Sequence, residues 1–288
     1  MIIIKTKNKL RSRIAEYKQD GEAINFVPTM GNLHQGHIEL VNMANSFSGK
    51  TVVSIFVNPM QFNNSDDLSR YPRTLDVDIK QLELAGVDLV FAPDVESIYP
   101  LSSPEQTRTR VVVPKISELL EGKSRPGHFD GVTTVVTKLF NLVQAEHAIF
   151  GEKDFQQLAL IKKMVLDLDM SVQIHGHPII READGLAMSS RNNNLTDRQR
   201  QQAPYLYQAL KKLQAYIQQQ QFEKEKTNYV KLQQQVINWL DSFGFITDYL
   251  LVADADTLLQ ADKNTSRRII LAATVLGEIR LLDNIYLG

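Results

Sequence analysis

Residues 23–47, AINFVPTMGNLHQGHIELVNMANSF, decide the fold. The short apolar run Ala23–Val27 predicts a buried strand that ends at Pro28, and Gly36–Phe47 predicts a helix because its apolar side chains recur at helical spacing. The same change from strand to helix is repeated along the first 180 residues. Strands that alternate with helices indicate a parallel sheet with helices on both faces. We therefore expect an α/β fold with a Rossmann-like, doubly wound parallel sheet.

Neighbouring stretches extend this pattern. Thr74 is expected to cap a helix, with Asp76 and Asp78 near the positive end of its dipole. Further strands are predicted over Thr51–Val57, Asp88–Ala92, Ala148–Phe150 and Val172–His175, and further helices over Val132–Val143 and Leu158–Leu168. In such sheets ligands bind beyond the carboxyl ends of the strands, where the strand order reverses. The loops after the strands are therefore where we expect the chemistry.

The pattern changes in the C-terminal part of the chain. Thr196 and Gln199 form a predicted capping box, and the helices that follow have glutamine-rich outer faces. Two more strands are predicted, over Phe245–Val252 and Arg268–Thr274. We expect a ligand-binding Rossmann-like domain over residues 1–180 and a smaller α+β C-terminal domain over residues 181–288.

Composition excludes several classes of protein. The 288 residues include no cysteine, so disulfides, thiolate nucleophiles, iron–sulfur clusters and cysteine-bound zinc are excluded. The formal net charge of −1 gives no broad attraction to nucleic acid or anionic lipid. No apolar run approaches the length of a membrane span, and Met1–Lys5 is too short for a signal-peptide core. We expect a cytoplasmic protein without nucleic-acid or membrane partners.

The segment Pro28–His37 runs from the first predicted strand into a helix. Glycines permit a tight turn, and a helix start offers free N–H groups and a positive dipole end to phosphate. His34 and His37 lie three residues apart and are expected side by side on the first helical turn. Three alternatives stay open for them: phosphate binding, an N-cap histidine beside a half-buried one with no ligand, or a metal site that lacks a visible third ligand.

A second segment, Phe56–Phe62, follows the next strong strand. Pro59 ends the strand, and the amides of Asn58 and Gln61 are expected to project at its carboxyl end, where they can bind a carboxylate or hydroxyl without adding charge. Ordinary turn chemistry is the alternative. The polar stretch Asn63–Arg70 that comes next is a candidate lid.

Two more loops carry phosphate-binding residue types. In Gly151–Gln157, Lys153 suits phosphate oxygens and Asp154 suits ribose hydroxyls, although a solvated helix start has the same composition. In Asp184–Asn192, two serines and Arg191 can surround a phosphate, although a plain surface loop is the alternative. The basic segment Lys123–Phe129 has no assigned role from spacing alone.

Together these segments are more specific than any one of them. The pair formed by His34-Gln-Gly-His37 and Met188–Arg191 resembles the two signatures of class I adenylate-forming enzymes and nucleotidylyltransferases. The longer sequence motifs around these signatures resemble those of the pantoate–β-alanine ligase family along nearly the whole chain. That resemblance also rests on Phe56–Phe62, Tyr71–Thr74, Arg125–Phe129, Gly151–Asp154, Asp184–Asn192 and Asp254–Leu258.

The resemblance implies an ATP-dependent ligase of pantothenate biosynthesis. Such an enzyme condenses (R)-pantoate with β-alanine through pantoyl adenylate and releases AMP and pyrophosphate. It implies Mg²⁺ carried mainly by the phosphates, no metal site of the protein's own, and a homodimer. The first domain would bind the nucleotide and pantoate, and the C-terminal domain would close over the ATP site. His37, His34, Lys153 and Arg191 would be the catalytic residues.

The implied ligand contacts divide into two groups. ATP would be bound by Thr29, Met30, Gly31, Asn32, Leu33, His34, Gln35, Gly36, His37, Gly151, Glu152, Lys153, Asp154, Ile180, Met188, Ser189, Ser190 and Arg191. Pantoate and β-alanine would be bound by Gln61, Gln157 and Asn58. Two residues depart from the family pattern: Gln35, in a turn that acts through its backbone, and Phe155, where some members have tyrosine.

Other functions remain to be separated from this one. A nucleotidylyltransferase would share the His-x-Gly-His loop but needs more cations for a phosphorylated acceptor, whereas Gln61 and Gln157 are neutral. A tRNA synthetase needs an anticodon domain and a basic surface. A nucleotide-binding sensor would need the phosphate loops without the substrate glutamines.

Overall fold

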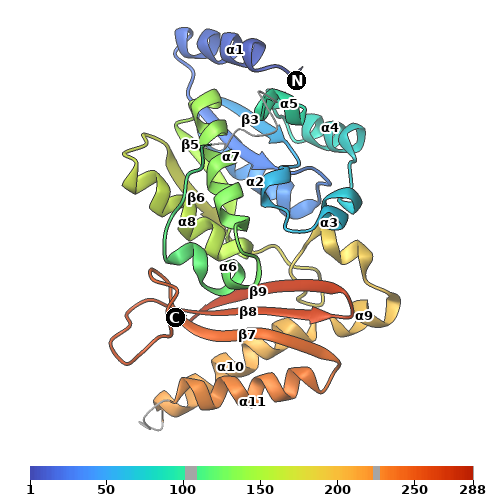
Figure 1. The fold of residues 1–288 in the computed structure, drawn as a ribbon, viewed down its shortest axis with the longest axis vertical. Coiled ribbons are helices and arrows are strands. Elements are labelled where there is room, and N and C mark those ends of the chain that lie inside the picture. Colours follow the sequence, from blue (N-terminus) through green and yellow to red (C-terminus); the bar gives the residue numbers. More distant parts are fainter. Residues whose placement is uncertain (101–108, 223–227, 288) are drawn as a thin grey trace. The chain divides into compact units, whose positions relative to one another are not determined.

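A computed structural model describes residues 1–100, 109–222 and 228–287, and its chain forms two compact units (Figure 1). The first comprises Met1–Glu152 and Gln156–Pro178, and the second comprises Lys153–Phe155 and Ile179–Gly288. The short segment Lys153–Phe155 therefore groups with the C-terminal unit, although the residues on both sides of it belong to the first.

The first unit alternates strands and helices throughout. Its elements are β1 (Ile2–Ile4), α1 (Lys7–Gln19), β2 (Ile24–Thr29), α2 (Gln35–Asn45), β3 (Lys50–Ile55), η1 (Pro59–Gln61), α3 (Ser65–Arg70), α4 (Leu75–Leu84), β4 (Leu89–Phe91), α5 (Val95–Ile98), η2 (Ile116–Glu118), α6 (Leu120–Ser124), α7 (His128–Val143), β5 (His147–Gly151), η3 (Glu152–Asp154), α8 (Phe155–Asp167) and β6 (Gln173–His177).

All six strands of this unit lie parallel in one sheet, in the order β1-β4-β3-β2-β5-β6. The chain builds outward from β2 through β3 and β4 and then returns to the other side of β2 with β5. The strand order therefore reverses between β2 and β5, and ligands of such sheets bind beyond the carboxyl ends of the strands at this point. The loops that follow β2 and β5 are two of the segments singled out in the sequence.

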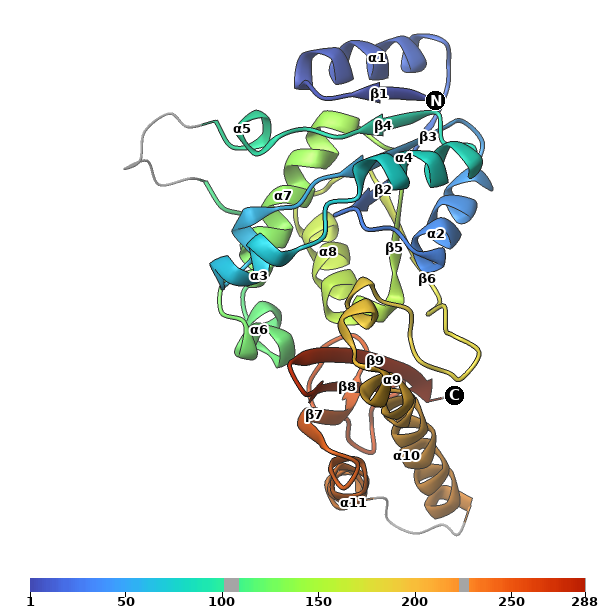
Figure 2. The ribbon, with the colours of Figure 1, turned by 90° about the vertical axis from the view of Figure 1, so that its right-hand side faces the viewer.

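Helices cover both faces of the sheet. Helix α2 packs on β2, β3 and β5 and contacts α4, while α7 packs on β2 and contacts α1. The Thr137 hydroxyl of α7 contacts the Met164 sulfur of α8, which places α8 beside α7. Figure 2 shows α1 next to the edge strand β1, which pairs with β4. Because both faces are covered, strand residues such as Phe26 and Phe91 are fully buried.

The predicted strands and helices of this unit are present, with shifted ends. Strand β2 does not stop at Pro28 but continues to Thr29. Beyond Phe26 only β3 pairs with β2, so the strand has lost one neighbour where proline removes a donor. Helix α1 and strand β1 were not predicted, because α1 buries only Leu10 and Ile14 in an otherwise polar sequence.

The second unit is built on an antiparallel sheet in the order β7-β8-β9. Its elements are η4 (Ser190–Asn194), α9 (Asp197–Gln202), α10 (Tyr205–Phe222), α11 (Tyr229–Asp241), β7 (Phe245–Asp254), β8 (Arg268–Leu276) and β9 (Ile279–Leu287). Helices α10 and α11 pack against each other and against the sheet (Figure 1). The capping box of Thr196 and Gln199 is present at the start of α9, as predicted.

The fold class predicted from the sequence is thus observed: a parallel α/β sheet and a smaller α+β unit. Strand β9 is the main element that the sequence did not predict. None of the helices in the described part of the chain is long and apolar enough to span a membrane.

Candidate active site

The loop between β2 and α2 is held in shape by its backbone. Gly31 has a φ of 78° and Asn32 a φ of 51°, conformations that favour glycine and asparagine. The Thr29 hydroxyl donates to the Ser54 carbonyl at 2.7 Å and accepts the Gly31 N–H at 3.3 Å. These bonds fix the turn at the carboxyl end of β2.

Asp78 is the main anchor of this loop, a role different from the helix-dipole role predicted for it. Its carboxylate accepts the N–H groups of Asn32 and Leu33, both at 2.9 Å, and the residue is 1% exposed. The predicted N-cap Thr74 makes no cap bond; its hydroxyl donates instead to the Asp78 carboxylate at 3.2 Å. A Cβ on Gly31 would lie 3.0 Å from an Asp78 oxygen, so the loop and the carboxylate are in direct contact.

His34 and His37 lie side by side, with ring centroids 4.1 Å apart. Nδ1 of His34 accepts the Gly36 N–H at 3.1 Å, and Nδ1 of His37 accepts the His34 N–H at 3.3 Å. Because each Nδ1 accepts, the proton of each neutral ring is on Nε2. Both imidazoles are therefore set up to donate through Nε2.

This capping arrangement corrects one expectation. The start of α2 was expected to offer free N–H groups to phosphate, but those of His34 and Gly36 bond to the imidazoles, and that of His37 bonds to the His34 carbonyl at 2.8 Å. The backbone N–H groups of His34, Gly36 and His37 are therefore already bonded within the protein.

Gln61 lies close to this loop. Its Nε2 is 3.0 Å from the Met30 sulfur, and its Oε1 accepts from Asn58 Nδ2 at 3.0 Å. Asn58 is 1% exposed and also bonds to the Gly131 carbonyl, the Tyr99 hydroxyl and the Met60 N–H. The structure thus brings Met30 and Gln61 together as predicted, but the Asn58 amide, expected to project toward a ligand, is buried among protein groups.

The segment Arg125–Phe129, which had no predicted role, contacts the backbone carbonyl of Gln61. His128 Nδ1 lies 2.7 Å from the Gln61 carbonyl, and Arg125 contacts both that carbonyl and His128 Nε2, at 3.4 and 3.3 Å. A carbonyl only accepts and a guanidinium only donates, so His128 carries its proton on Nδ1. Gly131 allows α7 to approach, since a Cβ there would lie 2.4 Å from the Met60 carbonyl oxygen.

Strand β5 ends at Gly151 and η3 follows at Glu152, and both residues are half-buried. Gln157 is also half-buried, while its neighbour Gln156 is buried and bonds to Ile116, Leu119 and Glu121. Gln156 therefore fixes the start of α8 to the η2–α6 segment.

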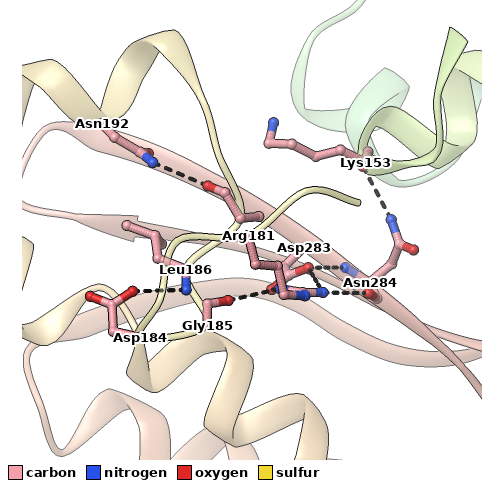
Figure 3. A network of polar contacts seen from close by, with 9 residues as sticks. Lys153, Arg181, Asp184, Gly185, Leu186, Asn192, Asp283 and Asn284 are labelled. Atoms are coloured by element: carbon pink, nitrogen blue, oxygen red, sulfur yellow. Dashed lines mark hydrogen bonds and ion pairs between the residues drawn. The ribbon is translucent and has the colours of Figure 1, made fainter. Parts of the chain in front are cut away.

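The second unit contains the remaining predicted residues. Lys153 lines a small cavity together with Ser189, Arg191 and Asn192, so the structure brings the predicted cations and one predicted serine together. Lys153 Nζ lies 4.0 Å from Asp154 Oδ1, and the Lys153 carbonyl accepts from Asn284 Nδ2 at 3.1 Å (Figure 3).

The loop that carries Met188–Arg191 is a narrow hairpin. The Met188 N–H donates to the Ile180 carbonyl at 2.9 Å, which brings two predicted ATP-binding residues side by side. Gly185 turns the hairpin with a φ of 93°. Ser189 is the N-cap of the η4 helix, and its hydroxyl accepts the Arg191 N–H at 3.3 Å.

An ion pair between Arg181 and Asp283 holds this hairpin to β9. The guanidinium binds the carboxylate through two hydrogen bonds, at 2.7 and 2.8 Å (Figure 3). It also stacks on the Tyr207 ring, 3.8 Å from the ring centroid. It also donates to the Gly185 carbonyl at 3.0 Å. Burial raises the pKa of the Asp283 carboxyl, and pairing with Arg181 opposes that effect.

Comparison with known proteins gives this arrangement a family. The family model for pantoate–β-alanine ligase matches residues 2–286. The chain belongs to the pantoate–β-alanine ligase family. It is 50% identical over 276 residues to the pantothenate synthetase of Aliivibrio fischeri, covering 96% of this chain and 92% of that protein.

Solved pantoate–β-alanine ligases have the same fold. A structure of the pantothenate synthetase from Thermus thermophilus matches with a TM-score of 0.88 at 40% identity, covering 100% of this chain and 99% of that one. The Francisella tularensis ligase, solved as a complex with β,γ-ATP and β-alanine, matches with a TM-score of 0.81 at 36% identity, covering 99% and 97%. Family, fold class and enzyme class, a ligase, are thus confirmed.

The residues that anchor the loops of this family member were not predicted from the sequence. Asp78 lies in the first turn of a helix, where the sequence indicates only an interaction with the helix dipole. Arg181, Asp283 and Asn284 belong to no local sequence pattern, because their partners lie far away in sequence. Within residues 1–100, 109–222 and 228–287, no three His, Cys, Asp or Glu side chains lie close enough together to hold a metal ion.

Proposed function

We propose that this enzyme condenses (R)-pantoate with β-alanine to pantothenate, using ATP and passing through pantoyl adenylate. The observation that carries this proposal is the family match over residues 2–286. The Francisella tularensis relative, solved with an ATP analogue and β-alanine, supports both ligands.

ATP is assigned to loops of both units. In the first unit these are Thr29, Met30, Gly31, Asn32, Leu33, His34, Gln35, Gly36, His37, Gly151 and Glu152. In the second they are Lys153, Asp154, Ile180, Met188, Ser189, Ser190 and Arg191. The Nε2–H groups of His34 and His37, which follow from the accepted bonds at Nδ1, supply uncharged donors to phosphate oxygens. Lys153 and Arg191 supply positive charge beside the Ser189 hydroxyl.

Pantoate is assigned to the amides of Gln61 and Gln157. An amide binds a carboxylate without fixing a charge, so the carboxylate stays nucleophilic. Asn58 was expected to contact substrate as well. Its four bonds to Gln61, Gly131, Tyr99 and Met60 favour a positioning role for it instead.

The proposed reaction has two steps. A pantoate carboxylate oxygen attacks the α-phosphorus of ATP, an O–P bond forms, and the bond to pyrophosphate breaks. The neutral β-alanine nitrogen then attacks the acyl carbon, the amine loses a proton, and the bond to AMP breaks. Charge develops on phosphate oxygens in the first step, so donors fixed in advance lower its barrier most. The acid is activated on AMP, so no thiol is needed in a chain without cysteine.

Mg²⁺ is assigned to the phosphates of ATP. Mg²⁺ usually keeps several waters and binds through substrate phosphates and one or two carboxylates. We also propose a homodimer, checked by a light-scattering mass near twice 32.7 kDa.

Exchange of radioactive pyrophosphate into ATP tests the first step. We expect exchange only when pantoate is added. Exchange that requires another carboxylic acid, or transfer of AMP to a phosphorylated acceptor, would overturn the proposal. Nucleotide binding without pyrophosphate release under any acid would indicate a sensor.

Two variants test the assigned donors. His37→Ala and Lys153→Ala should each lower the exchange rate by at least about a hundredfold, the scale of one lost transition-state donor. Lys163→Ala is the matched control, because Lys163 lies on the outer face of α8 and pairs with Asp167. A near-normal rate would remove His37 or Lys153 from the mechanism.

A further inference from the structure

Strand β9 holds the Lys153–Phe155 segment in the second unit. Asn284, 4% exposed, donates from Nδ2 to the Lys153 carbonyl at 3.1 Å (Figure 3). Two residues further on, the Tyr286 ring packs edge-on against the Phe155 ring, with centroids 5.8 Å apart. Both contacts come from the same strand, so β9 determines where this short segment lies within the unit.

The same strand also holds the hairpin that carries Met188–Arg191. Asp283 accepts two hydrogen bonds from Arg181, and the Asn284 carbonyl accepts a third at 3.2 Å. Side chains of adjacent strand residues point to opposite faces. Asp283 and Asn284 can therefore bind different segments at one point of β9, the hairpin on one side and Lys153 on the other.

Lys153 benefits from such an anchor. Its ammonium is a point charge on a flexible four-carbon stem, so fixing the backbone limits the region that Nζ can reach. The Lys153 side chain lines the same cavity as Ser189 and Arg191. Its backbone must be fixed relative to them if the three groups are to meet one phosphate chain.

We propose that Asn284 is a positioning residue that holds Lys153 beside Ser189 and Arg191, so that they form one preassembled site for the ATP phosphates. This rests on the proposed function, which assigns Lys153 to ATP. Asn284 itself touches no reacting group: its side chain acts through the Lys153 carbonyl. Its effect is thus expected on ATP affinity and not on pantoate affinity, because Gln61 belongs to the first unit.

The test compares Asn284→Ala with a matched control. Loss of one neutral, part-buried hydrogen bond corresponds to up to roughly tenfold in an equilibrium constant. We expect Asn284→Ala to raise the KM for ATP by about tenfold and to leave the KM for pantoate within about twofold. Gln214→Ala is the control, because Gln214 Nε2 also donates to a β9 carbonyl, that of Tyr286, at 3.3 Å. It should leave both KM values unchanged.

A double-mutant cycle separates positioning from general loss of structure. If Asn284 acts through Lys153, Asn284→Ala should add less than about twofold to the loss of ATP affinity caused by Lys153→Ala. Calorimetric titration with a non-hydrolysable ATP analogue measures this without turnover. Additive losses, or an equal rise in the KM for pantoate, would overturn the proposal.

A second variant keeps the proposal testable if Asn284→Ala folds poorly. Asn284→Asp keeps the volume but places an oxygen against the Lys153 carbonyl, so the KM for ATP should rise at least as much. Wild-type-like ATP affinity in the Asp variant would contradict the proposal. If the wild-type protein binds the analogue but shows no pantoate-dependent exchange, the proposed function fails, while the binding cycle still decides the role of Asn284.

Discussion

Two loops assigned to the nucleotide are each anchored by a buried aspartate, and the two anchors differ in their donors. Asp78, 1% exposed, holds the β2–α2 loop through the Asn32 and Leu33 N–H groups and the Thr74 hydroxyl. Asp283, 3% exposed, holds the second-unit hairpin through the Arg181 guanidinium. The first anchor uses uncharged donors and the second uses an ion pair.

This difference explains which groups each loop presents. Asp78 accepts two backbone N–H groups, so they are no longer available to an anion, and we propose that the imidazoles of His34 and His37 are the donors instead. In the second unit, Arg181 balances the charge of Asp283, and the phosphate site that we propose there uses the cations Lys153 and Arg191. A carboxylate that anchors the loop of an anion-binding site would repel the anion. Its negative charge must therefore be balanced by a cation, or the anion must be bound by donors farther from the carboxylate.

The largest effect is expected at the ion pair. Asp283→Asn removes the charge that balances Arg181, and breaking a buried pair from one side lowers the free energy of unfolding by about 3–5 kcal/mol. Urea unfolding of the full chain measures it. Asp256→Asn is the control, because the Arg267–Asp256 pair is more than half exposed and should contribute less than about 1 kcal/mol.

A smaller effect is expected at Asp78. Asp78→Asn keeps the shape but turns an NH₂ group toward one of the two backbone N–H donors, and a buried unsatisfied group costs about 1–3 kcal/mol. The same variant should lower pantoate-dependent exchange, since the His34–His37 turn begins at this loop. Asp76→Asn, an exposed neighbour in the same helical turn, is the control. A loss larger than that of Asp283→Asn would reverse the comparison of the two anchors.

Much of the fold was predictable because it depends on local patterns. The strand-to-helix alternation from Ala23 to His175 identified the parallel sheet, and the capping box at Thr196 marked the start of α9 correctly. Helix α1 was missed because Leu10 and Ile14 are too few to produce a clear apolar face.

The loops of the candidate site could be predicted from the sequence, but the residues that anchor these loops could not. His34, Gln61, Lys153 and Ser189 stand in recognisable motifs, and two of them, Lys153 and Ser189, line one cavity. Their anchors do not form motifs, since Arg181 and Asp283 are 102 residues apart and Asn284 and Lys153 are 131 apart. Such contacts exist only once the strand order and the position of β9 are known.

The smallest effect is expected at the rim of the hairpin, and it depends on pH. Burial raises the pKa of Asp184, but hydrogen bonds from Arg200 and the Leu186 N–H outweigh this, so the pKa lies below its ordinary value of 3.8. A lowered carboxyl pKa stabilises the fold at neutral pH, and this contribution is lost as the pH falls through 3.8 and below.

Arg200→Ala should therefore cost less than about 1 kcal/mol at pH 7, because both partners are more than a third exposed. The difference from wild type should shrink as the pH falls below 3.8, because protonation of Asp184 removes its pairing with Arg200. Urea unfolding at pH 7 and at pH 3 measures the two differences, and a gap that widens in acid would contradict this account.

The grouping of Lys153–Phe155 with the second unit has a consequence for exchanging parts between relatives. A hybrid that joins residues 1–178 of one ligase to the C-terminal part of another would pair its own Lys153 and Phe155 with a foreign β9. Compatibility then depends on the few positions that face them, Asn284 and Tyr286 here. A hybrid should therefore take the C-terminal part and the segment Lys153–Phe155 from the same ligase, although the two are separate in the sequence.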